Sequence, residues 1–236
     1  MFEYRGLQDM IFMALYCVAA FSALLAGVYL LWRRGNAFAD DVGSSRVLRQ
    51  WTAALMAAIV GSHVWWYVIG VYWLADDWLV RTITVIMLDH LTLVPLVMGV
   101  LLALLQDRRR PLWPWLVVQV PVLVFALMGI VRRNWFWGEE VSYYCQLAVV
   151  TVFIVYYIRA LRQYGRWLLD NYADLERKEV WQSLVFAVGL FVFYELYTSN
   201  AGEMTKEYLA QVITLFLVVF LVWRVETLQE LEGEET

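Results

Sequence analysis

The chain has 236 residues, of which 62% are hydrophobic, 17% aromatic and only 17% charged. Soluble domains contain about 45–50% apolar and about 25% charged residues, so this composition excludes an ordinary soluble domain and a disordered chain. The formal net charge of −4 argues against a nucleic-acid-binding protein, because such proteins have a basic surface. The composition is typical of a helical protein that crosses a membrane several times.

Seven apolar stretches follow one another along the chain. Because a helix rises about 1.5 Å per residue, roughly 20 apolar residues cross the hydrocarbon core of a bilayer. The stretches cover about 8–32, 50–74, 80–105, 112–131, 141–161, 180–198 and 207–224. They lack the period-two alternation of barrel strands, and helices satisfy their own backbone groups in lipid. The sequence therefore predicts an all-α polytopic membrane protein, with a seven-transmembrane helix bundle over residues 1–225.

Positive charges are distributed unequally between the two sides of this predicted bundle. If the N-terminus lies outside, 13 of the 18 Lys and Arg residues fall on the cytoplasmic side and 5 fall outside. Cytoplasmic loops carry the excess of Lys and Arg in membrane proteins. We therefore expect the N-terminus outside, the C-terminus in the cytoplasm, and a multi-pass location in a bacterial inner membrane.

Two polar segments lie outside the apolar stretches on the predicted cytoplasmic side. Residues 162–179 place apolar and charged side chains at helical spacing, which predicts an interfacial amphipathic turn or an extension of the fifth helix. Residues 226–236 carry five glutamates, which is typical of a solvated acidic tail or linker.

A few polar side chains interrupt the apolar stretches. Ionisable residues inside a membrane are costly and are functional candidates by default. If their faces converge, they form a ligand site in the outer half of the bundle, with apolar walls and a few polar contacts. The competing interpretation is that each group bonds a neighbouring helix as structural support. The predicted ligand-binding residues are His63, Asp89, His90, Gln146, Glu195 and Gln211.

The two histidines allow a second hypothesis. His63 and His90 are expected at similar depth on adjacent antiparallel helices, and Asp89 is placed to orient either imidazole. Two facing histidines are also the arrangement that ligates a b-type haem or helps to hold a metal ion. A small transporter is a third hypothesis, although Pro95 and Pro121 have no matching pair of broken helices elsewhere. Because sequence motifs of hydrolases and phosphate loops are absent, we expect neither an enzyme nor a cofactor.

Three stretches in the last third of the chain are the most distinctive. They read RWLLDNYADLERKEVWQSL (166–184), SNAGEMTKEYLAQV (199–212) and LVWRVETLQELE (221–232). With the apolar spans, they resemble the seven-helix sensor module of bacterial membrane-bound AraC-type helix-turn-helix transcription regulators. The resemblance implies a membrane sensor that binds a small ligand and signals through the acidic segment to a cytoplasmic DNA-binding domain beyond this chain. The chain itself would contact lipid rather than nucleic acid, with a homodimer as one assembly to test.

Overall fold

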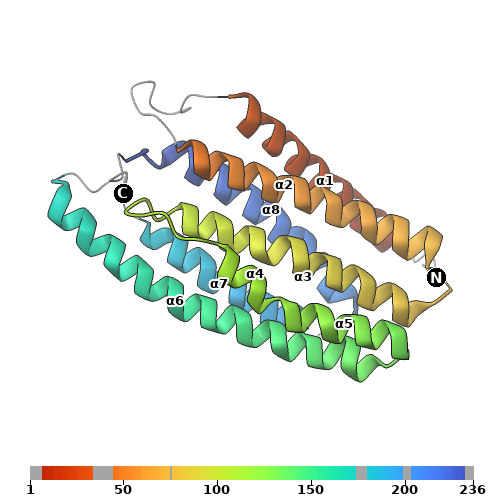
Figure 1. Cartoon of the computed structure of the whole chain (residues 1–236). Helices are drawn as coiled ribbons and strands as arrows, with labels where there is room; N and C mark the ends of the chain where they lie inside the picture. The colour runs from red at the N-terminus through yellow and green to blue at the C-terminus, as the bar shows by residue number, and fades with distance from the viewer. Residues whose placement is uncertain (1–6, 34–44, 75, 174–179, 199–202, 232–236) are drawn as a thin grey trace.

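The computed structural model describes residues 7–33, 45–74, 76–173, 180–198 and 203–231. Within these ranges the protein is a bundle of long helices without a strand (Figure 1). The long helices are α1 (Leu7–Trp32), α2 (Arg46–Tyr67), α3 (Trp78–Ala103), α5 (Val120–Arg132), α6 (Ser142–Asn171), α7 (Trp181–Thr198) and α8 (Glu203–Thr227). The short elements are α4 (Trp113–Val118) and two π-helical turns, η1 (Val68–Trp73) and η2 (Phe136–Val141).

Each predicted apolar stretch contains one helix or one pair of consecutive helices. Six of the described helical segments are long and apolar enough to cross a membrane, which supports a multi-pass membrane protein. They are Met10–Trp32, Arg46–Gly70, Trp78–Ala103, Trp113–Arg132, Phe136–Asn171 and Glu207–Thr227. Most side chains in the second half of α7 lie outside the described residues, so a seventh crossing stays a prediction. The predicted extension of the fifth apolar helix is present, because α6 continues to Asn171.

The fourth apolar stretch is broken into α4 and α5 at Gln119. Pro121 follows the break, and proline has no N–H to continue the helical hydrogen-bond pattern. By contrast, α3 continues through Pro95 without a break.

The connection between α5 and α6 is a close hairpin. Arg133 adopts a left-handed backbone conformation with φ of 49° and ends α5. A Cβ atom added at Gly129 would lie 2.1 Å from the Cα atom of Gly138 in η2, so only glycine permits this backbone approach. The hairpin therefore fixes how α5 lies against the start of α6.

The two ends of the bundle are named here by one arginine each. At the Arg110 end, α1, α3, α6 and α8 finish and α2 begins (Figure 1). At the Arg133 end, η1 and α5 finish and α3 begins (Figure 1). The helix axes thus run from one end to the other with alternating direction.

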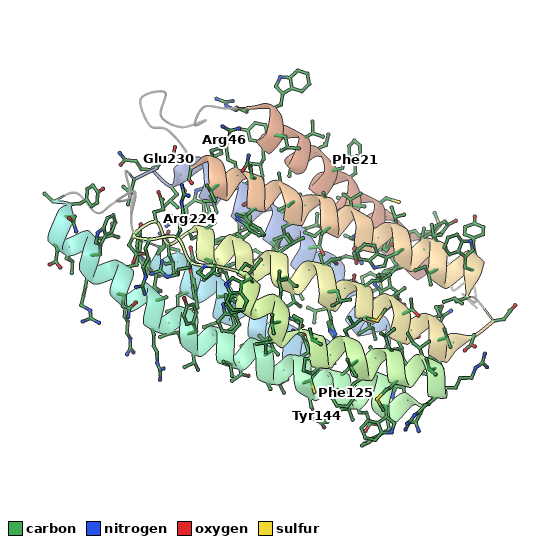
Figure 2. All side chains as sticks on the ribbon, viewed as in Figure 1. Phe21, Arg46, Phe125, Tyr144, Arg224 and Glu230 are labelled. Carbon is green, nitrogen blue, oxygen red and sulfur yellow. The ribbon has the colours of Figure 1, made fainter. Side chains whose placement is uncertain are left out.

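The flanks of the bundle are apolar. Figure 2 shows Phe21, Phe125 and Tyr144 on the body of the bundle, and Phe21 and Tyr144 are 61% and 65% exposed. Arg46, Arg224 and Glu230 gather instead near the Arg110 end (Figure 2). Large apolar side chains that face outward over the length of the helices are expected where lipid is the solvent.

Candidate functional site

Asp89 of α3 accepts hydrogen bonds from three side chains of α2. The Ser62 hydroxyl donates to Oδ1 at 2.7 Å, and the Trp65 indole N–H donates to the same oxygen at 3.0 Å. The Trp66 indole N–H donates to Oδ2 at 2.8 Å. A carboxylate offers several acceptor positions, and both of its oxygens are used here. The three neutral donors therefore solvate a carboxylate group within an apolar helix pair.

Helical spacing explains why these donors converge. Ser62, Trp65 and Trp66 occupy positions i, i+3 and i+4, which lie on one face of a helix. That face packs against α3, and His63 points about 100° around the helix toward other neighbours. The adjacent residues Ser62 and His63 of α2 therefore contact two different helices, α3 and α8.

His63 joins α2 to α8. Its ring nitrogen Nδ1 lies 2.8 Å from the carbonyl oxygen of Ile59, and Nε2 lies 3.0 Å from Oε1 of Gln211. The hydroxyl of Tyr16 in α1 donates to the backbone carbonyl of His63, and the Tyr16 and His63 rings lie 4.5 Å apart between centroids. Side chains of α1 and α8 therefore both contact the His63 imidazole of α2.

The contacts of His63 define which of its ring nitrogens carries a proton. Because the Ile59 carbonyl can only accept, Nδ1 is the donor of that hydrogen bond. At the other nitrogen, the Gln211 amide can present either its oxygen or its NH₂ group to Nε2. One amide of α8 therefore completes the hydrogen bonding of this imidazole.

Five of the six predicted site residues lie in the half of the bundle nearest the Arg133 end. Measured from that end of each helical segment, they lie about 12–18 Å along it: His63, Asp89, His90, Gln146 and Gln211. His90 follows Asp89 in α3 and is partly buried. Glu195 belongs to α7, and its side chain lies outside the described residues.

Gln146 of α6 is completely buried, with 0% exposure. Neither its amide oxygen nor its amide nitrogen has a hydrogen-bond partner in the part of the chain that the structure describes. Buried amides in proteins are normally hydrogen-bonded, to protein or to ordered water. Gln146 is therefore a predicted site residue whose amide has unused capacity for a polar contact.

The hydrogen bonds of Asp89 differ from the expectation that its carboxylate orients a histidine. Asp89 bonds Ser62, Trp65 and Trp66, while both ring nitrogens of His63 are occupied by Ile59 and Gln211. No prediction from the sequence named Trp65 or Trp66, so their indole N–H groups were missed as donors. Their spacing relative to Ser62 was the available signal.

A second polar cluster lies at the Arg110 end. The Arg49 guanidinium of α2 donates to Glu226 of α8 at 2.7 Å, and their side chains are 6% and 2% exposed. Arg49 also donates to the Arg33 backbone carbonyl at 2.9 Å. Burying an ion pair is costly unless both charges are well bonded, and here the guanidinium bonds both a carboxylate and a backbone carbonyl. The same helix pair, α2 and α8, is therefore bonded in both halves of the bundle.

The chain after α8 is held against the loop that follows α3. The side-chain amide of Gln106 donates to the Gln229 carbonyl at 3.0 Å, and its oxygen accepts from the Leu231 N–H at 2.7 Å. Leu228 and Leu231 are 0% and 8% exposed. The segment predicted to start an acidic tail or linker at residue 226 is thus packed on the bundle as far as Leu231.

The haem and metal hypotheses depend on free ligand atoms. Among the described residues, no group of three or more His, Cys, Asp or Glu side chains is close enough to hold a metal ion. His63 would have to release Ile59 or Gln211 before it could bind iron. In this arrangement its imidazole serves helix contacts.

Comparisons with known proteins give no relative: no family model, curated protein or solved structure matches this chain. The resemblance to the sensor modules of AraC-type regulators therefore stays a prediction.

Proposed function

We propose that the chain is a membrane-embedded sensor domain. A small ligand binds in the half of the bundle that contains His63, Asp89 and Gln211, and α8 carries the response to the Arg110 end. In this proposal the chain crosses the membrane seven times, with the N-terminus outside and the Arg110 end in the cytoplasm. The output is a cytoplasmic partner, such as the DNA-binding domain that the sequence resemblance implies.

One observation supports this proposal most strongly: α2 and α8 are bonded to each other in both halves of the bundle. His63 contacts Gln211 in one half, and Arg49 contacts Glu226 in the other. Because α8 is a continuous helix between Gln211 and Glu226, a shift of α8 at the His63–Gln211 contact also moves Glu226 relative to Arg49. Signalling requires two helix arrangements whose balance a ligand biases, and these two contacts define one of them.

The chemistry of the candidate site suits a small molecule with both hydrogen-bond donors and acceptors. Gln146 has an unpaired amide within the described residues, and the amide of Gln211 contains both a hydrogen-bond donor and an acceptor. Apolar walls with a few convergent polar groups are typical of ligand sites between helices.

The test measures whether a change at Gln211 reaches the end of α8. Leu228 is completely buried, so a cysteine at this position reports on opening of the packed segment. In a Cys17→Ser, Cys145→Ser background, we expect Gln211→Ala to accelerate maleimide modification of Leu228→Cys. Allosteric couplings of about 1–3 kcal/mol predict an increase of about fivefold or more.

Thr214→Val is the matched control on the same helix. The Thr214 hydroxyl donates only to the Ala210 carbonyl within α8, so its loss leaves the contact between α2 and α8 in place. Equal modification rates in the Gln211→Ala and Thr214→Val backgrounds would contradict the proposed coupling.

A further inference from the structure

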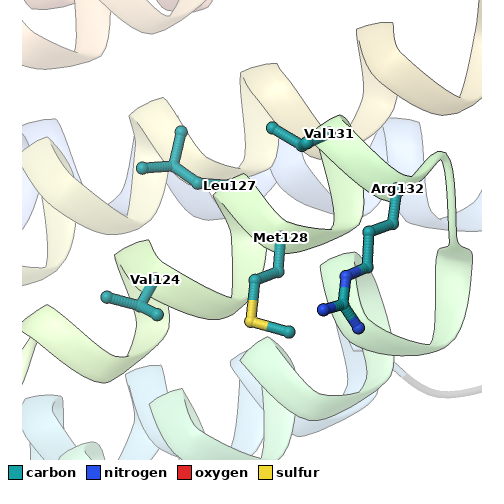
Figure 3. Close-up of a pocket in the computed structure, with 5 residues that line it drawn as sticks. All are labelled: Val124, Leu127, Met128, Val131 and Arg132. Atoms are coloured by element: carbon teal, nitrogen blue, oxygen red, sulfur yellow. The ribbon is translucent and has the colours of Figure 1, made fainter.

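A hollow of about 310 Å³ lies on the surface of α5, separate from the polar contacts described above (Figure 3). Its described lining residues are Val124, Leu127, Met128, Val131 and Arg132. The lining is apolar except at Arg132, which is the last residue of α5. The hollow therefore has an apolar body and a cationic end.

The positions of the lining residues give the hollow its direction. Val124, Met128 and Arg132 are four residues apart and form one ridge of α5, while Leu127 and Val131 form the next ridge. Figure 3 shows Leu127 and Val131 on one side of this face and Met128 and Arg132 on the other. From Val124 to Arg132, the lining residues extend about 12 Å along the helix axis.

Arg132 is available to an external anion. It is exposed, and no ion pair involves it in the described part of the chain. The next residue differs in this respect, because Arg133 pairs with Asp77 at 3.0 Å. An arginine at the end of a membrane helix is placed at the level of lipid phosphates.

We propose that this groove binds one phospholipid with an anionic headgroup, its acyl chain between the two ridges and its phosphate on Arg132. An extended hydrocarbon chain matches the apolar, linear body of the groove, and Arg132 supplies the complementary charge at one end. The groove lies within a segment long and apolar enough to cross a membrane, where lipid is the surrounding solvent.

A second copy of the chain fits this face less well. Two copies in one membrane are related by an axis normal to it, so packing α5 on α5 places the two grooves at equal depth. The two Arg132 side chains would then meet at the same end of the interface, and like charges in contact are unfavourable.

The experiment uses the full chain in phosphatidylcholine vesicles with a trace of spin-labelled lipid. Electron paramagnetic resonance measures the lipid immobilised on the protein. We expect spin-labelled phosphatidylglycerol to be retained more strongly than spin-labelled phosphatidylcholine. Arg132→Gln should reduce this preference about fivefold, the factor that corresponds to about 1 kcal/mol per basic residue near an anionic surface. The control Arg133→Gln should leave the preference unchanged.

A second pair of variants tests the groove itself. Leu127→Trp places a large side chain in the groove, and Val120→Trp places the same side chain elsewhere on α5, at a position that is 51% exposed. We expect loss of phosphatidylglycerol retention only in Leu127→Trp. Equal retention in these two variants, or equal effects of the two arginine substitutions, would overturn the proposal. A disulfide-linked dimer formed through Met128→Cys, in a Cys17→Ser, Cys145→Ser background, would identify a second copy as the occupant instead.

Discussion

At the scale of single residues, Asp89 is held by donors that match a carboxylate and do not match an amide. In Asp89→Asn, the NH₂ group must face either Trp66 or the pair Ser62 and Trp65, and all of these are donors in the present arrangement. A buried donor left without its acceptor costs about 1–3 kcal/mol. We expect the free energy of unfolding in detergent micelles to fall by this amount. Asp170→Asn, on an exposed part of α6, serves as the control.

Equal stability of Asp89→Asn and Asp170→Asn would show that the three hydrogen bonds to Asp89 contribute little. A larger loss in Asp89→Asn than in the control would support a carboxylate that α2 is built to solvate.

For single residues, the sequence predicts which side chains are polar but not which partners they bond. That His63, Asp89 and Gln211 are polar residues within apolar stretches is visible from the residue types alone. Their partners are not, because the His63–Gln211 contact joins residues 148 positions apart and depends on which helices are neighbours. Helical spacing places Ser62, Trp65 and Trp66 on one face, but only the packing of α2 on α3 gives that face a carboxylate to bind.

At the scale of helices, the ion pair between Arg49 and Glu226 tests how α2 and α8 are joined. Glu226→Gln removes a carboxylate that the buried Arg49 guanidinium bonds, and breaking a buried pair on one side costs about 3–5 kcal/mol. The double variant Arg49→Met, Glu226→Leu removes both charges, and such replacements are often neutral or stabilising. We expect denaturant unfolding in mixed micelles to show a large loss for the single variant and recovery in the double variant.

Glu230→Gln is the control for that series, because Glu230 is exposed near the same end of the bundle. A double variant no more stable than Glu226→Gln would mean that Arg49 and Glu226 act independently of each other.

Helix positions were more predictable than helix details. A run of roughly 20 apolar residues identifies a membrane helix because its length matches the bilayer. The sequence therefore located α1, α3 and α8 to within a few residues. It did not indicate η1 or η2, because a π turn differs from an α-helix by hydrogen-bond register rather than by residue type. The acidic composition after residue 226 also concealed the packed leucines at 228 and 231.

At the scale of the whole molecule, the proposed sensor requires the Arg133 end and the Arg110 end to lie on opposite membrane faces. The described arginines support this direction: Arg108, Arg109, Arg159, Arg162 and Arg166 belong to the loop and helix end on the Arg110 side. The excess of positive charge marks the cytoplasmic face of membrane proteins. A signal that enters near His63 and leaves near Glu226 would then cross the bilayer along α8.

The most direct test of this proposal therefore measures on which membrane face each end of the bundle lies. In a Cys17→Ser, Cys145→Ser background, single cysteines are placed at Asn134 and at Arg109, which are exposed at the two ends. On intact cells, we expect a membrane-impermeant maleimide to label Asn134→Cys, and to label Arg109→Cys only after the membrane is permeabilised. Labelling of both positions, or of Arg109→Cys alone, on intact cells would contradict a signal that passes from outside to the cytoplasm through this bundle.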